Sequence, residues 1–119
     1  MRRPERIAEM LREEVSQIVG YELDDPRVET VTVTEVRVSE NMRDAKVFVL
    51  VEGSDDEINA ALSALRNAAP YIRKQVAFAL DLRHAPALHF VRDTVEERAN
   101  RIENLLSEIQ TPERQNDDL

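Results

Sequence analysis

The stretch Ala64-Leu-Arg-Asn-Ala-Ala-Pro-Tyr-Ile-Arg-Lys-Gln-Val76 decides the fold, because it places a proline inside a helical pattern. A proline ring inside a helix removes a hydrogen bond and clashes with the carbonyl four residues back, at a cost of roughly 3 kcal/mol. The sequence therefore predicts two helices that meet at an angle, one ending before Pro70 and one running from Pro70 to about Leu80. Apolar residues keep the helical period on both sides of the proline, at Ile58, Leu62, Leu65, Ala69, Ile72, Val76, Ala79 and Leu80.

The first of these two helices has a recognisable start. Ser54-Asp-Asp-Glu57 has the form of a capping box, in which the serine accepts from the backbone while Glu57 reaches back. Another helix is predicted at the beginning of the chain, from Pro4 to Val19, where apolar residues fall on one stripe. Pro4 suits its first turn, and Gly20 suits its C-terminal end.

Two strands lie between these helical segments. Residues 30–38 and 45–51 alternate apolar and polar side chains and are rich in β-branched residues, which is typical of strands. The connection between them is short and predicts an antiparallel hairpin. The alternation slips between Val33 and Val36, so we expect a bulge near Thr34–Glu35.

The remaining elements complete a small α+β fold. Asp24-Asp-Pro-Arg27 and Asp81-Leu-Arg-His-Ala-Pro86 read as loops, and Ala87-Leu-His-Phe-Val91 reads as a third strand. The order is helix, strand, strand, helix, break, helix, strand. The simplest architecture is a three-stranded mixed sheet with the helices on one face, formed by residues 1–92.

We expect a helical extension over residues 93–109 and a disordered acidic tail over residues 110–119. Thr94-Val-Glu-Glu97 offers a second capping box at the start of the extension. The extension could dock on its own domain, or it could join two copies of the chain. Its narrow apolar stripe consists of Val95, Ala99, Ile102, Leu106 and Ile109.

Size and composition limit the class of protein. A chain of 119 residues is enough for one domain with a single core. The absence of cysteine excludes thiolate catalysis and cysteine-ligated zinc, and it suits a reducing compartment. No apolar run reads as a signal peptide or spans a bilayer, so we expect a cytoplasmic protein.

The charge is unevenly distributed along the chain. The formal net charge is -8, which at first argues against a nucleic-acid partner. Residues 93–119 hold eight acids against three arginines, whereas residues 60–92 hold five arginines and lysines against Asp81 alone. The segment around Pro70 is thus the positive part of an acidic protein.

A break at Pro70 would create a place for a phosphate. The N–H groups of Tyr71, Ile72 and Arg73 would form a helix N-terminus, and Ala69 has no side-chain oxygen to cap them. Helix N-termini favour anions, and Arg73 and Lys74 would add full charges. In the alternative reading, the proline only bends the helix around the core, and water satisfies the donors.

The series of motifs resembles the ribosome-binding factor A family over about residues 4–109. It implies a type II KH-like domain in which an Ala-x-Gly helix–kink–helix replaces the glycine-rich phosphate loop, with Ala68-Ala-Pro70 at that position. The resemblance is carried by Arg6-Ile-Ala-Glu-Met-Leu-Arg-Glu-Glu-Val15, Asp25-Pro-Arg-Val28, Val31-Thr-Val-Thr-Glu-Val-Arg-Val-Ser39, Ala45-Lys-Val-Phe-Val49, Ala68-Ala-Pro-Tyr-Ile-Arg73 and Pro86-Ala-Leu-His-Phe90.

The resemblance implies binding to the free, immature 30S subunit and its 16S ribosomal RNA. It further implies help with late maturation, including 5′-end processing and growth in the cold. KH modules clamp a nucleic-acid backbone through the connection between two helices, so the expected RNA contacts surround the kink. They are Arg66, Asn67, Ala69, Tyr71, Arg73, Lys74, Arg83, His84 and Arg92, with Arg2, Arg3 and Arg6 as a second phosphate contact.

Two other classes of function compete with this reading. An enzyme is disfavoured. The cluster of acidic residues near the start of the second helix is best explained as a helix cap, and the spacing of the two histidines does not fit a zinc site. With only two glycines, the chain also has no glycine-rich nucleotide-binding motif. We therefore expect a monomer without catalysis, metal or cofactor. The open alternative is a protein–protein interaction or dimerisation module that binds no RNA. The residues weighed for catalysis are Glu52, Asp55, Asp56, Glu57, His84 and His89.

Overall fold

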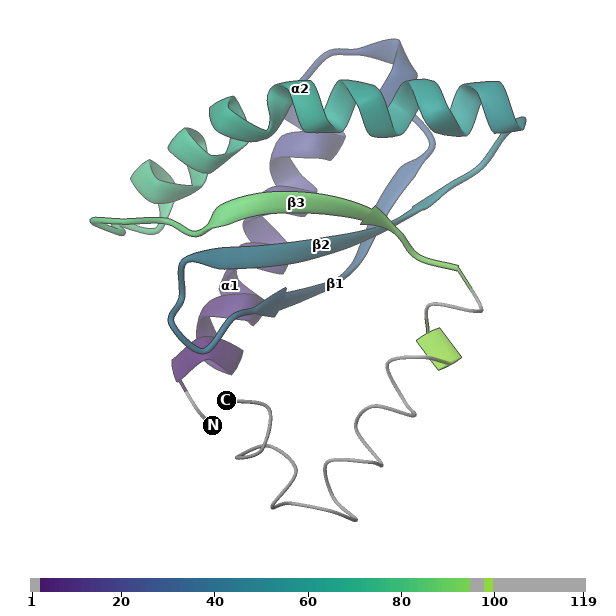
Figure 1. Ribbon diagram of the computed structural model, residues 1–119. Coiled ribbons are helices and arrows are strands. Elements are labelled where there is room, and N and C mark those ends of the chain that lie inside the picture. The colour runs from purple at the N-terminus through teal and green to yellow at the C-terminus, as the bar shows by residue number, and fades with distance from the viewer. Residues whose placement is uncertain (1–2, 95–97, 100–119) are drawn as a thin grey trace.

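The computed structural model describes residues 3–94 together with residues 98 and 99 (Figure 1). Two long helices and three strands make up the domain, with a π-helical turn and a 3-10 turn between the first helix and the first strand. The elements in chain order are α1 Arg3–Gln17, η1 Ile18–Glu22, η2 Pro26–Val28, β1 Val31–Val38, β2 Asp44–Val51, α2 Asp55–Ala79 and β3 Ala87–Arg92.

The three strands form one mixed sheet in the order β1-β2-β3. β1 and β2 are antiparallel, and β2 and β3 are parallel. This confirms the predicted hairpin and the predicted mixed sheet. The predicted bulge is also confirmed, because Val33 lies opposite Val49 while Glu35 lies opposite Phe48, which leaves Thr34 as the extra residue.

Both helices pack on the same face of the sheet, where α1 lies over β1 and α2 lies over β3 (Figure 1). The side chains of β2 that alternate toward the helices, Ala45, Val47 and Val49, are fully buried. They meet buried residues of both helices to form a single core. The fully buried helix residues include Leu11, Val15, Leu65, Ile72 and Val76.

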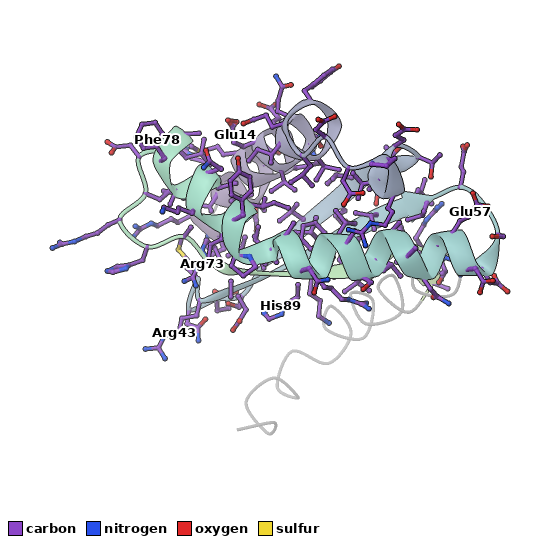
Figure 2. The ribbon with its side chains drawn as sticks, turned by 90° about the horizontal axis from the view of Figure 1, so that it is seen from above. Glu14, Arg43, Glu57, Arg73, Phe78 and His89 are labelled. Atoms are coloured by element: carbon purple, nitrogen blue, oxygen red, sulfur yellow. The ribbon has the colours of Figure 1, made fainter. Side chains whose placement is uncertain are left out.

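α2 is one continuous helix of 25 residues with Pro70 inside it, so the predicted break into two helices is wrong. Buried residues before and after Pro70 share one stripe, and a continuous helix lets all of them pack on the sheet at once. That burial outweighs the proline's cost of roughly 3 kcal/mol. The helix bends along its length (Figures 1 and 2), as expected when a proline interrupts the hydrogen-bond ladder.

The start of α2 is fixed by the predicted capping box. The Glu57 N–H donates to Ser54 Oγ at 3.2 Å, and the Ser54 N–H donates to Glu57 Oε1 at 2.9 Å. The second bond lowers the pKa of the Glu57 carboxyl, because it stabilises the ionised form. Gly53 precedes the cap with φ of 137°, a conformation that a residue with a Cβ rarely adopts.

The connection from α1 to β1 differs from the prediction in two places. Gly20 does not end the first helix, because the chain continues as a π-helical turn to Glu22, in which the Leu23 N–H donates to the Ile18 oxygen at 3.0 Å. The predicted loop after it contains the short turn η2, which is capped by the Asp25 side chain. Both changes add local backbone hydrogen bonds.

The predicted C-terminal extension mostly lies outside the described residues. This applies to its apolar stripe except Ala99, to the Glu97 half of the second capping box and to the acidic tail. Within the described part, the Arg98 N–H donates to the Thr94 oxygen at 3.0 Å, and residues 98 and 99 are helical. The boundary after residue 92 and the KH-like relationship stay predictions.

Candidate nucleic-acid interface

The predicted phosphate site at a helix N-terminus beside Pro70 does not form. Because α2 is continuous, the N–H groups of Tyr71, Ile72 and Arg73 lie in the helix interior, where each is directed at the carbonyl four residues back. Donors engaged in this way are not available to a phosphate. Any interface on this helix must therefore use side chains rather than free amides.

Two arginines of α2 lean toward β3 and the loop before it. Arg66 Nη2 donates to the Phe90 oxygen at 3.2 Å, and Arg73 Nε donates to the Ala85 oxygen at 2.9 Å. Both side chains remain exposed, and a guanidinium has five N–H donors. One bond to a carbonyl therefore fixes the direction of each arginine while other donors stay accessible to a ligand.

The outer face of α2 carries a different set of side chains. Asn67, Tyr71, Lys74 and Phe78 follow one another at helical spacing, and all four are exposed. The exposed fraction is 48% for Tyr71 and 87% for Phe78, so two aromatic rings flank Lys74. Phe78 was missed from the sequence, although its place off the apolar stripe of the helix could have identified it.

Cationic side chains gather at the end of the molecule where α2 finishes. The Ala87 N–H donates to the Arg43 oxygen at 2.8 Å, so the turn between β1 and β2 meets the start of β3 there. This end holds six arginines and lysines but only three described acids, Glu40, Asp44 and Asp81. We call this region the cationic end, and it comprises Arg37, Arg43, Lys46, Arg73, Lys74, Arg83, His84 and His89.

The opposite end of the molecule is acidic. The Thr30 hydroxyl donates to the Glu52 oxygen at 2.8 Å, which ties the start of β1 to the segment before α2. Exposed acids gather here around the start of α2, where they also suit the positive end of the helix dipole. These acids are Glu29, Glu52, Asp55, Asp56 and Glu57.

The structure brings together only part of the predicted site. Arg73, Lys74, Arg83 and His84 share the cationic end, while Arg92 lies opposite Val49 at the far end of β3. Arg66, Asn67 and Tyr71 lie further back along α2, and Ala69 packs partly against the core. Arg3 and Arg6 lie on the first turns of α1, which begins at the end of the molecule where β1 and β2 are joined (Figure 1). Arg2 is outside the described residues.

Half of the cationic end was not predicted as a site. Arg37, Arg43, Lys46 and His89 come from the hairpin and from β3 and join the loop residues only through the sheet pairing. Figure 2 shows Arg43, Arg73 and His89 on one side of the molecule and Phe78 on the other. A sequence reading could have found them only with the register of all three strands in hand.

Metal binding and membrane insertion find no support in the part of the chain that the structure describes. Within residues 3–94, 98 and 99, no group of three or more histidines and acids is placed to hold a metal ion. The same residues contain no helix with the length and apolar character needed to cross a membrane. Glu57, one of the acids weighed as catalytic, is engaged in the helix cap.

Comparisons with known proteins agree on one family. The family model described as ribosome-binding factor A matches residues 3–106. Ribosome-binding factor A of Thermomicrobium roseum is 47% identical over 116 residues, which cover 98% of this chain and 89% of the relative.

Solved structures of the same family are similar in fold. The crystal structure of ribosome-binding factor A from Thermus thermophilus matches with a TM-score of 0.66 at 25% identity, covering 75% of this chain and 94% of that one. A homology model of the Thermus thermophilus factor, fitted into the electron cryo-microscopy map of a 30S complex, matches with a TM-score of 0.61 at 26% identity, covering 71% and 88%.

Proposed function

The chain belongs to the ribosome-binding factor A family, and from this premise we propose that it binds the 30S ribosomal subunit through 16S ribosomal RNA. The observation that carries the proposal is the similarity to the Thermus thermophilus factor whose coordinates were fitted into a 30S complex. The cationic end supports it independently, since phosphates supply most of the affinity of proteins for nucleic acid.

In this proposal, the cationic end faces the RNA and the acidic end faces away. A net charge of -8 repels a polyanion at long range, so the protein must approach with its positive end first. Arg73 would contact the backbone with its remaining donors, Lys74 would supply a point charge, and Arg83 would add a second guanidinium. Tyr71 would stack on an unpaired base, with Lys74 beside it.

The proposal extends to the stage of subunit assembly at which the protein acts. The protein would bind the immature subunit and assist late maturation, including processing of the 5′ end, and it would support growth in the cold. It would act by binding rather than by catalysis, and it would work in the cytoplasm where subunits assemble.

Co-sedimentation of the tagged protein with purified small subunits tests the proposed function. We expect the protein to sediment with 30S particles, and to sediment more with precursor particles than with mature ones. A protein that stays in the supernatant with both kinds of particle at moderate salt would contradict the proposal.

The proposed contact residues are tested by Lys74→Glu combined with Arg83→Glu. We expect weaker binding to 30S particles, because the two changes reverse the charge at proposed phosphate contacts. We expect an unchanged melting temperature, because both side chains are exposed. Arg12→Glu, on the exposed face of α1, is the control for added negative charge. Equal binding by the double variant and the wild type would remove this region from the interface.

A further inference from the structure

Three side chains line up across the face of the sheet that points away from the helices. Arg37 of β1 lies directly opposite Lys46 of β2, and Lys46 lies directly opposite His89 of β3. Their neighbours along each strand, such as Val36, Val47 and Phe90, are buried toward the helices, so all three residues of this row point to the free face. At a strand separation of about 4.8 Å, the row spans roughly 10 Å.

A row of this kind is unfavourable for the fold alone. Like charges directly opposite each other in a sheet destabilise the pairing. Among the residues that the structure describes, no ion pair engages Arg37 or Lys46. The one acid paired within the row is Asp44, whose Oδ1 lies 2.8 Å from His89 Nε2. Arg37 and Lys46 are therefore two adjacent cations that no described residue engages in an ion pair.

The free face has a closed half and an open half. In the closed half, Phe48 is only 1% exposed although it points away from the helices. The Thr34 hydroxyl lies 2.7 Å from Asp93 Oδ2, and Arg98 Nε donates to Asp93 Oδ1 at 3.1 Å, so Asp93 and Arg98 lie over this half. The row lies in the open half, where Arg37, Lys46 and His89 are exposed.

The row is continuous with the rest of the cationic end. Arg43 is held beside β3 through its carbonyl oxygen, and Arg73 is held beside the loop before β3. Figure 2 shows Arg43, Arg73 and His89 on the same side of the molecule. A negatively charged chain could thus pass from α2 around the start of β3 and onto the free face of the sheet.

We propose that the row of Arg37, Lys46 and His89 is a second phosphate-binding surface for ribosomal RNA, joined to the contacts on α2. The inference rests on the proposed function and extends it from the helix to the sheet. Charge complementarity identifies the occupant, because two adjacent cations about 4.8 Å apart, with the His89 ring beside them, suit a backbone that carries a negative charge at every nucleotide. Such contacts position the RNA without reading its sequence.

The test uses Arg37→Gln and Lys46→Gln, singly and combined, in the full-length protein. Glutamine removes the charge and keeps much of the side-chain length, and loss of the like-charge pair should leave the melting temperature unchanged or raise it. The measurement is the affinity for purified 30S particles as a function of salt. Arg12→Gln is the matched control, because it removes an exposed cation from α1.

Each phosphate contact changes the affinity by roughly threefold between about 50 and 200 mM salt. We therefore expect each single variant to reduce the salt-dependent loss of affinity by roughly threefold and the double variant by roughly tenfold, whereas Arg12→Gln leaves it unchanged. A double variant with the wild-type affinity and salt dependence would overturn the inference. Weaker binding with an unchanged salt dependence would also overturn it, because it would indicate contact with a ribosomal protein.

The outcomes separate this inference from the proposed function. If Lys74→Glu with Arg83→Glu weakens binding but Arg37→Gln and Lys46→Gln do not, the row is not a phosphate-binding surface and the proposed function is still supported. If the wild type does not bind 30S particles at all, both fall together.

Discussion

Arg73 illustrates how a single side chain can be fixed and still be available for binding. Its Nε donates to the Ala85 oxygen in the loop before β3, which settles the orientation of the guanidinium plane. Arginine can do this because its five donors point in fixed directions from one rigid planar group, whereas the three donors of a lysine all sit on a single nitrogen at the end of a flexible chain. Residue identity therefore matters here beyond charge.

Glu57 gives a prediction at the same scale. Its pKa lies below the usual value of 4.5, first because the Ser54 N–H donates to the carboxylate and second because of the Ser54 side chain. The contribution of this carboxylate to stability is complete above the ordinary pKa and is lost as pH falls through the lowered one. In Glu57→Gln, the amide oxygen can still accept from the Ser54 N–H, but the side chain no longer ionises. We therefore expect the melting temperature of this variant to fall less than that of the wild type between about pH 7 and pH 3.

Thermal melts of the two proteins over that range measure the difference. Glu13→Gln removes an exposed carboxylate from α1 and controls for the change in net charge. Parallel pH profiles for Glu57→Gln and the wild type would show that the lowered pKa makes no contribution.

At the scale of elements, local patterns predicted the strands better than the long helix. The alternation of apolar and polar residues shifts by one position between Val33 and Val36, and this shift located the bulge at Thr34. It could do so because the alternation along a strand shows directly which face of the sheet is buried. The proline penalty at Pro70 is also local, but the decision between a bend and a break depends on burial summed over the whole helix. That sum is not accessible from the sequence, which is why the sequence predicts a division where the helix only bends.

Pro70→Ala tests this explanation of α2. An alanine in an exposed helix interior is favoured over proline by about 3 kcal/mol, and the loss of proline's restriction on the unfolded chain offsets up to about 1 kcal/mol. We therefore expect the free energy of unfolding to rise by about 2 kcal/mol, measured by urea denaturation. Ser63→Ala, at an exposed position of the same helix, controls for helix propensity alone. A destabilised Pro70→Ala variant would mean that the core requires the bend.

At the scale of the whole molecule, charge is separated between two ends. The sequence showed a positive segment around Pro70, and Arg73, Lys74, Arg83 and His84 of that segment do lie together. It could not show that Arg37, Arg43, Lys46 and His89 join them, because these residues meet only through strand register and the parallel pairing of β3. The distribution of charge along the chain therefore predicted half of the residues of the cationic end, and the other half became apparent only from the sheet topology.

The orientation of the protein on the 30S subunit tests the central claim most directly. The chain has no cysteine, so Ala79→Cys near the cationic end and Asn59→Cys near the acidic end each give one attachment point for an iron chelate. The two positions are roughly 30 Å apart along α2 at 1.5 Å per residue. We predict that hydroxyl radicals from Ala79→Cys cleave 16S ribosomal RNA in the complex and that those from Asn59→Cys cleave it weakly. Stronger cleavage from Asn59→Cys, or equal cleavage from both positions, would contradict an interface at the cationic end.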